Sequence, residues 1–173
     1  DKLGGESWDN KKSKVRDRIL AMAHTLLALH AERAVRPGHA YVGRPPMYHQ
    51  FAETFPFTET LDQEAAIEEV LEDLAQPTPM DRLVVGDVGF GKTEVAMRAA
   101  MRVVLDNKQV AVLCPTTVLS FQHLETFKKR FAGLPVNIAL LSAFRTAAQR
   151  SAVMVEVQAG KVDIVIGTTS LLG

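Results

Sequence analysis

Cysteine and long apolar runs are what this chain of 173 residues most lacks. Its one cysteine, Cys114, excludes an internal disulfide framework and lies in an apolar run typical of a small core residue. No run approaches the ~20 apolar residues of a membrane span, and the polar residues 1–14 contain no signal-peptide core. We therefore expect a protein of the reducing cytoplasm with no membrane partner.

An excess of either charge is missing as well, because twenty Lys and Arg balance twenty Asp and Glu. Net charge therefore neither favours nor excludes nucleic acid as a partner, and any basic surface must be local. The five histidines form no H-x-x-x-H or H-E-x-x-H pair, and neither Ser142 nor Ser151 lies in a G-x-S-x-G elbow. We expect neither a zinc site nor a serine nucleophile.

One glycine-rich stretch matches a phosphate-binding loop. The pattern G-x-x-x-x-G-K-[ST] is met by Gly86, Gly91, Lys92 and Thr93. The amides of such a loop and the start of the helix behind it attract the phosphates of ATP. Lys92 would reach the β- and γ-phosphates, and the Thr93 hydroxyl would help to hold Mg²⁺. The alternative is a glycine-rich turn that happens to precede a lysine.

The segments on either side of this loop favour the phosphate-binding interpretation. Residues 83–85 form a short apolar run typical of a buried parallel strand. Residues 94–105 carry valine and alanine at helical spacing. A strand before the loop and a helix after it are the context that the motif requires.

The first third of the chain predicts a long helix and then a break. Apolar residues from Val15 to Leu29 recur in steps of four and three, which predicts a helix over 10–34. Five basic residues in its first half either bind nucleic acid or an acidic partner, or are simply solvated, and solvation is favoured. The helix should end at Arg36-Pro37-Gly38. We predict a segment over 1–36, a stiff Pro/Gly linker over 37–50 and a core lobe over 51–173.

The core lobe alternates helices and strands. Thr60 is the expected N-cap of a helix over 61–75, with Gln63 at the capping-box position. The remaining predicted elements are strands at 110–113, 136–141 and 162–166 and helices at 118–131 and 146–158. This alternation predicts an α/β fold with a parallel sheet and helices on both faces.

Ligands of parallel sheets bind at the carboxyl ends of the strands. Four loops would meet at that edge, namely 86–93, 115–117, 142–145 and 167–170. Two of these loops, 115–117 and 167–170, offer hydroxyl groups and helix-start amides that suit the backbone phosphates of a nucleic acid. Helix capping by Thr and Ser is the alternative role of these hydroxyls.

The residues that hydrolysis requires are not found after Lys92. Phosphate-loop enzymes use an acidic residue near Mg²⁺ at the end of a neighbouring strand. No acid downstream ends an apolar strand, and Asp163 opens one. The chain ends at Gly173, where another segment of sheet is expected. We therefore expect nucleotide binding without turnover.

Several stretches resemble the bacterial transcription-repair coupling factors, which are superfamily-two double-stranded DNA translocases related to RecG. They are residues 55–63, 81–100, 108–117 and 160–168. Residues 2–5 with Trp8 resemble the exit from the family's RNA-polymerase-interaction domain, and residues 10–34 resemble the long helix that joins this domain to the motor. The resemblance implies an incomplete RecA-like lobe that binds ATP and Mg²⁺. It also implies a parent protein that tracks duplex DNA, displaces stalled RNA polymerase and recruits an excision-repair damage-recognition protein.

The resemblance further implies roles for individual residues. Gln63 would read the adenine edge, and Phe55 would stack on the base. The residues implied to hold the phosphates and Mg²⁺ are Gly86, Asp87, Val88, Gly89, Phe90, Gly91, Lys92 and Thr93. The residues implied to contact the DNA backbone are Thr116, Thr117, Ser142, Phe144, Arg145, Thr168 and Thr169. The family usually has arginine at the position of Ala143 and histidine at that of Thr169, so DNA contacts at these positions should differ.

Two other functions fit the same residues. One is a RecG-type fork-remodelling helicase, against which Trp8 and the long first helix argue. The other is a nucleotide-binding module without motor activity.

Overall fold

The computed structural model describes residues 6–142 and 146–171. The chain forms two compact units, one of residues 1–40 and 76–81 and one of residues 41–75 and 82–173. Neither unit contains, in the residues described, a helix that is long and apolar enough to cross a membrane.

The first unit is built on a helix of 30 residues, α1 (Glu6–Val35). The predicted helix is confirmed and begins four residues earlier than expected. It ends before Pro37, and the Gly38 amide donates to the Pro77 carbonyl at 2.7 Å. The apolar residues spaced by three and four are each between 52% and 65% exposed. They are Val15, Ile19, Met22, Leu26 and Leu29.

The second unit begins with a short helix, α2 (Pro46–Glu53), which has proline at its first turn. The expectation of an extended linker over 37–50 is therefore wrong in its last residues, because residues 46–50 are helical. Tyr48 and Phe51 are 3% and 1% exposed. Burying these two rings outweighs the local preference of the preceding Gly and Pro for an extended chain. The division of the chain at 37–50 stays a prediction.

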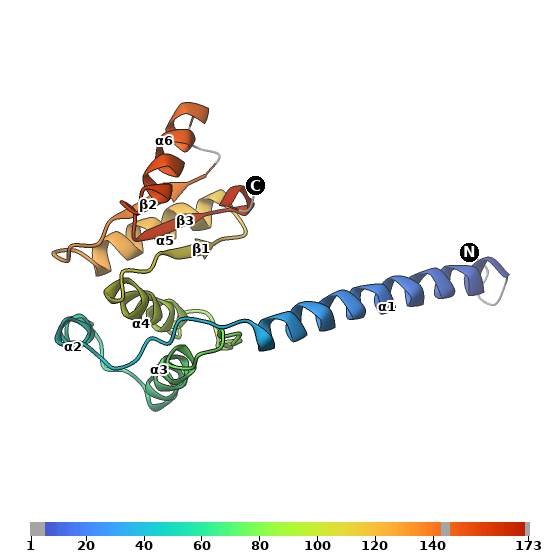
Figure 1. Cartoon of the computed structure of the whole chain (residues 1–173), viewed down its shortest axis with the longest axis horizontal. Helices are drawn as coiled ribbons and strands as arrows, with labels where there is room; N and C mark the ends of the chain where they lie inside the picture. The colour runs from blue at the N-terminus through green and yellow to red at the C-terminus, as the bar shows by residue number, and fades with distance from the viewer. Residues whose placement is uncertain (1–5, 143–145, 172–173) are drawn as a thin grey trace. The chain divides into compact units, whose positions relative to one another are not determined.

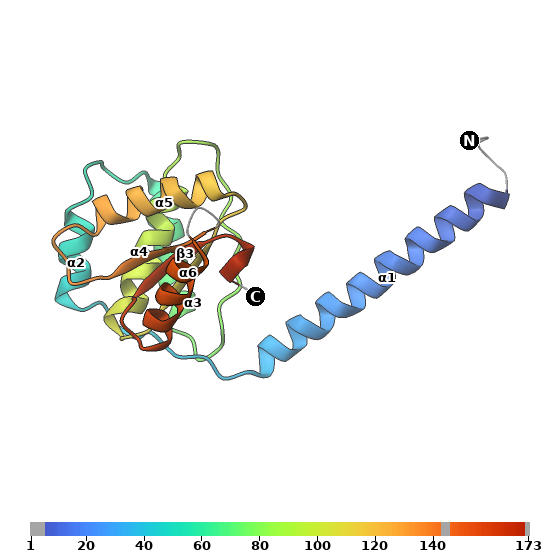
Figure 2. The same cartoon turned by 90° about the horizontal axis from the view of Figure 1, so that it is seen from above.

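Two longer helices follow. Helix α3 (Leu61–Leu74) starts with the predicted capping box, in which the Thr60 side chain accepts from the Gln63 amide and the Gln63 side chain accepts from the Thr60 amide. Helix α4 (Lys92–Leu105) starts at the motif lysine, two residues before the expected position. α2 and α3 both pack against α4 (Figure 2).

The sheet contains three strands in the order β1-β3-β2, all parallel. They are β1 (Val110–Leu113), β2 (Ile138–Leu141) and β3 (Ile164–Gly167), and the connecting helices are α5 (Thr117–Arg130) and α6 (Ala147–Gln158). A 3-10 turn, η1 (Thr169–Leu171), follows β3. Figure 1 shows α6 and α4 on opposite sides of the sheet. The predicted α/β fold with a parallel sheet is confirmed.

The expected strand at residues 83–85 is not formed. Leu83 and Val85 are 85% and 82% exposed. A strand requires a neighbour to accept and donate its ladder hydrogen bonds, and the sheet formed by the described residues includes only β1, β2 and β3.

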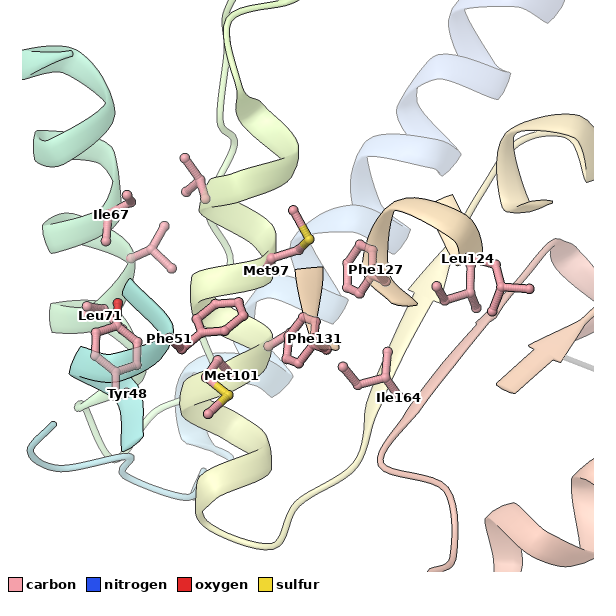
Figure 3. Close-up of a cluster of buried hydrophobic side chains, with 14 of the residues drawn as sticks. Tyr48, Phe51, Ile67, Leu71, Met97, Met101, Leu124, Phe127, Phe131 and Ile164 are labelled. Carbon is pink, nitrogen blue, oxygen red and sulfur yellow. The ribbon is translucent and has the colours of Figure 1, made fainter. Parts of the chain in front are cut away.

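Helix α4 lies at the centre of the larger core. Its Met97 and Met101 belong to one buried cluster with side chains of α2, α3, α5 and the sheet (Figure 3). Met101 and Ile164 are completely buried. A second cluster of Leu141, Val153, Val162 and Val165 fills the space under α6. Cys114 belongs to the larger cluster, as predicted, and burial raises the pKa of its thiol.

Gly167 ends β3 in a position that only glycine fits. A Cβ atom there would lie 2.3 Å from the Leu141 carbonyl oxygen, whereas one at Gly86 would come no nearer than 3.6 Å to any atom. We expect Gly167→Ala to lower the free energy of unfolding by about 2 kcal/mol or more. Gly86→Ala should change it by less than about 0.5 kcal/mol. Urea unfolding followed by circular dichroism measures both, and equal midpoints would contradict the crowding at Gly167.

Candidate nucleotide-binding site

The glycine-rich loop is curled and open to solvent. The Phe90 amide donates to the Asp87 carbonyl at 3.4 Å, which closes a turn over Val88 and Gly89. Gly89 and Gly91 have φ of 87° and 71°, a region that favours glycine. Val88 is 98% exposed and Phe90 62%. The loop therefore has the bend that the motif predicts, although no strand precedes it.

The amides at the end of this loop are available to a ligand. Within the described parts of the chain, the amides of Gly89, Gly91 and Lys92 donate to no acceptor. The Lys92 ammonium instead curls over the loop and donates to the carbonyls of Gly86 and Asp87, each at 2.6 Å. Donors that converge at a helix start form a site for an anion, and the lysine is poised to exchange two carbonyls for phosphate oxygens.

Gln63 connects helix α3 to the loop. Its Oε1 accepts from the Thr60 amide and its Nε2 donates to the Phe90 carbonyl, both at 2.9 Å. A Cβ at Gly91 would approach Gln63 Nε2 to 2.5 Å. The predicted contact of Gln63 with adenine stays a prediction, and in this conformation the amide would have to give up the Phe90 carbonyl to make it.

A cavity of about 770 Å³ lies beside the loop. Its walls include an aromatic segment, Phe55-Pro56-Phe57, together with Gly91 and Glu94 of the loop and helix α4. Phe55 and Phe57 contact edge to face, with ring centroids 5.6 Å apart. An apolar cavity with a few polar groups at its rim is typical of a small-molecule site, and the predicted stacking of Phe55 on a base is compatible with this position.

A buried ionic cluster that sequence reasoning missed forms part of the cavity wall, since Glu94 and Arg130 both line the cavity. The Glu94 carboxylate receives Arg98 Nε at 2.6 Å and Arg130 Nη2 at 2.8 Å. Arg98 also pairs with Glu59. Burial alone would lower the pKa of the Arg98 guanidinium, but its bonds to Glu94 and Glu59 raise the pKa above its ordinary value. The spacing of Glu94 and Arg98 by four was a visible signal, whereas Arg130 is remote in sequence.

The predicted DNA-contact residues are only partly gathered. The carboxyl ends of β1, β2 and β3 meet at one edge, since Leu113, Gly167 and Leu141 are in register. Thr116 caps α5, because its hydroxyl accepts from the Leu119 amide at 3.2 Å. This is the helix-capping role that the sequence left open for these hydroxyls. Thr117, Thr168 and Thr169 also follow strand ends at this edge.

Ser142, also predicted to contact DNA, is buried instead of lying at the surface of this edge. Ser142 follows β2 and is completely buried, with no hydrogen-bond partner for its hydroxyl among the described residues. A side chain without exposed surface does not reach a DNA backbone in this conformation. Ala143, Phe144 and Arg145 lie outside the described residues. No group of His, Cys, Asp or Glu in the described residues could hold a metal ion.

Comparison with known families decides the classification. Residues 60–173 match the DEAD/DEAH box helicase family. The chain belongs to this family. The matched residues include the curled loop, the sheet and the helices that cover it, so the helicase match and the fold describe the same part of the chain.

Individual relatives extend the match to α1. This chain is 52% identical to a transcription-repair-coupling factor of Myxococcus xanthus over 173 residues and 49% identical to one of Escherichia coli over 171 residues. These alignments cover 100% and 99% of this chain and 14% and 15% of the relatives. The chain thus spans about a seventh of their length.

A solved structure supports the fold. RecG bound to a three-way DNA junction is 30% identical, with a TM-score of 0.78 over 84% of this chain and 20% of that chain. The similarity is consistent with part of a RecA-like lobe, and the resemblance noted in the sequence is confirmed.

The buried cluster allows a test of its contribution to stability. Glu94→Gln would leave two nearly buried guanidinium groups without their shared anion, at a cost of about 3–5 kcal/mol. Glu68→Gln removes a carboxylate that pairs with Arg44 but is half exposed, so it should cost less than about 1 kcal/mol. Urea unfolding of the two variants measures the difference. Similar losses would show that the Glu94 cluster contributes no more than a surface pair.

Proposed function

We propose that this chain is the ATP-binding part of a double-stranded DNA translocase of the transcription-repair-coupling type. The observation that carries the proposal is the curled loop, in which free amides and the Lys92 ammonium converge at the start of α4. The triphosphate of ATP supplies the negative charge that this arrangement attracts. The cavity beside Phe55 and Phe57 would receive the base.

Mg²⁺ fits the residues at the same place. The Thr93 hydroxyl has no hydrogen-bond partner in the described residues, and it follows the lysine at the start of α4. An oxygen ligand of this kind, completed by phosphate oxygens and water, is what Mg²⁺ uses in phosphate-loop sites. When bound, the ion would neutralise charge on the phosphates, while Lys92 and the loop amides hold them in place.

We further infer that the parent protein acts on duplex DNA and on stalled RNA polymerase in the cytoplasm and recruits an excision-repair damage-recognition protein. The alignments with relatives named transcription-repair-coupling factor include α1. This supports a protein of the transcription-repair-coupling type over a RecG-type helicase. RecG matches 84% of the chain at 30% identity. Thr116, Thr117, Thr168 and Thr169 are the described candidates for contact with the DNA backbone, because they lie at one edge of the sheet.

Lys92→Ala tests the phosphate site. Removing the ammonium should weaken binding of Mg-ATP about tenfold or more, because charge-assisted contacts to phosphate are lost. Lys161→Ala is the matched control, since Lys161 is exposed and precedes β3 at the other end of the sheet. Isothermal titration calorimetry measures both affinities. Equal affinity of Lys92→Ala and the wild type would show that the loop does not bind the triphosphate.

ATP turnover by this chain should be absent. None of the acids in the described residues after Lys92 ends a strand, and Asp163 is engaged in accepting from the Asn137 amide at 2.7 Å. Phosphate release with Mg-ATP and duplex DNA should equal that of Lys92→Ala. Release clearly above this background would mean that the chain already contains the acid that activates water.

A further inference from the structure

The aromatic wall of the cavity is fixed at both ends by arginines. At its start, Arg130 Nη1 donates to the Thr54 hydroxyl at 2.7 Å and Nη2 donates to the Phe51 carbonyl at 2.8 Å. At its end, the Arg98 guanidinium pairs with Glu59. The loop between α2 and α3 therefore has a defined position although it has no regular secondary structure.

Both arginines are held by one carboxylate of the nucleotide helix. Arg130 Nε and Nη2 lie 3.0 and 2.8 Å from the two oxygens of Glu94, and Arg98 Nε lies 2.6 Å from Oε1. The three side chains are 5% to 8% exposed. Since Glu94 follows Lys92 and Thr93 directly in α4, the same turn of helix supports the phosphate loop and the aromatic wall.

The two arginines also contact the rings of Phe51 and Phe55, which both line the cavity. The Arg130 guanidinium carbon lies 3.9 Å from the centroid of Phe51 and 5.7 Å from that of Phe55, and the Arg98 guanidinium carbon lies 5.8 Å from that of Phe55. A planar guanidinium can stack on a ring and make bidentate hydrogen bonds at the same time, which an ammonium cannot do. Arg130 thus stacks on Phe51, binds the chain just before Phe55 and lies within cation–π distance of the Phe55 ring.

We propose that Arg130 is a positioning residue for the nucleotide base, which acts by holding Phe55 at a fixed place relative to the phosphate loop. This inference rests on the proposed function, because it requires that the loop bind the phosphates. Arg130 comes from the end of α5 and itself lines the cavity beside Phe55, and the role proposed for it is to act on the base through that ring. Its contribution is preorganisation: a wall that is already ordered loses less entropy when a base stacks on it.

The test compares a ligand that has a base with one that has none. We expect Arg130→Gln to weaken Mg-ATP about tenfold, within the range of lost base–aromatic stacking, and to change Mg-tripolyphosphate affinity less than about twofold. Arg130→Lys should recover only part of the lost Mg-ATP affinity, because an ammonium cannot make the bidentate hydrogen bonds of a guanidinium. Arg44→Gln, which removes an exposed arginine from its pair with Glu68, should change neither affinity.

A double-mutant cycle shows whether Arg130 acts through Phe55. In the wild type, Phe55→Ala should weaken ATP binding, and in Arg130→Gln it should add little, because the ring is already released. Additive effects, or equal weakening of ATP and tripolyphosphate by Arg130→Gln, would overturn the role of Arg130 alone. A wild type that binds neither ligand would overturn the proposed function as well.

Discussion

The buried carboxylate of Glu94 is the constraint on which the arrangement of the site depends. A charge this deeply buried is stable only with charged or hydrogen-bonding partners, and the partners are Arg98 on the same helix and Arg130 on α5. Arg130 in turn binds the end of α2 through the Phe51 carbonyl. One carboxylate therefore connects three helices, and removing it would leave Arg130 without an acidic partner and Arg98 with Glu59 alone.

The apolar core explains why this ionic cluster is not exposed to water. Helix α4 carries Met97 and Met101 into the space between α2, α3 and α5 (Figure 3). Phe51, Phe127 and Phe131 close the same region, with the Phe51 and Phe131 centroids 4.7 Å apart. Apolar burial supplies the main stabilisation, while the ion pairs fix which helix turns face one another. The start of α4 is left open to solvent at the glycine-rich loop.

The parts of the structure that depend on local sequence could be predicted. Thr60 and Gln63 are three residues apart, and their capping box forms as expected. The strand at 110–113 and the turn after Val35 likewise follow from short patterns. In each case the physical cause lies within one or two helix turns or one short apolar run.

The parts that depend on remote partners could not be predicted. Residues 83–85 have strand-like composition but no ladder, because pairing is a property of the neighbour as much as of the segment. Residues 46–50 were expected to be an extended linker, but they are helical because Tyr48 and Phe51 are buried in the core beside α4. Arg130 lies 36 residues from Glu94, and no spacing rule connects them. The phosphate loop itself was found because its glycines, lysine and threonine are contiguous.

Amide hydrogen exchange with and without Mg-ATP tests the central claim most directly. If the bent loop binds the triphosphate, exchange of the amides of residues 88–93 should slow strongly when the nucleotide is added, because they become donors to phosphate oxygens. Protection should be weaker over 54–60, where the base would contact side chains. Unchanged exchange at 88–93 under conditions where ATP is bound would contradict the account, since the nucleotide would then occupy another place.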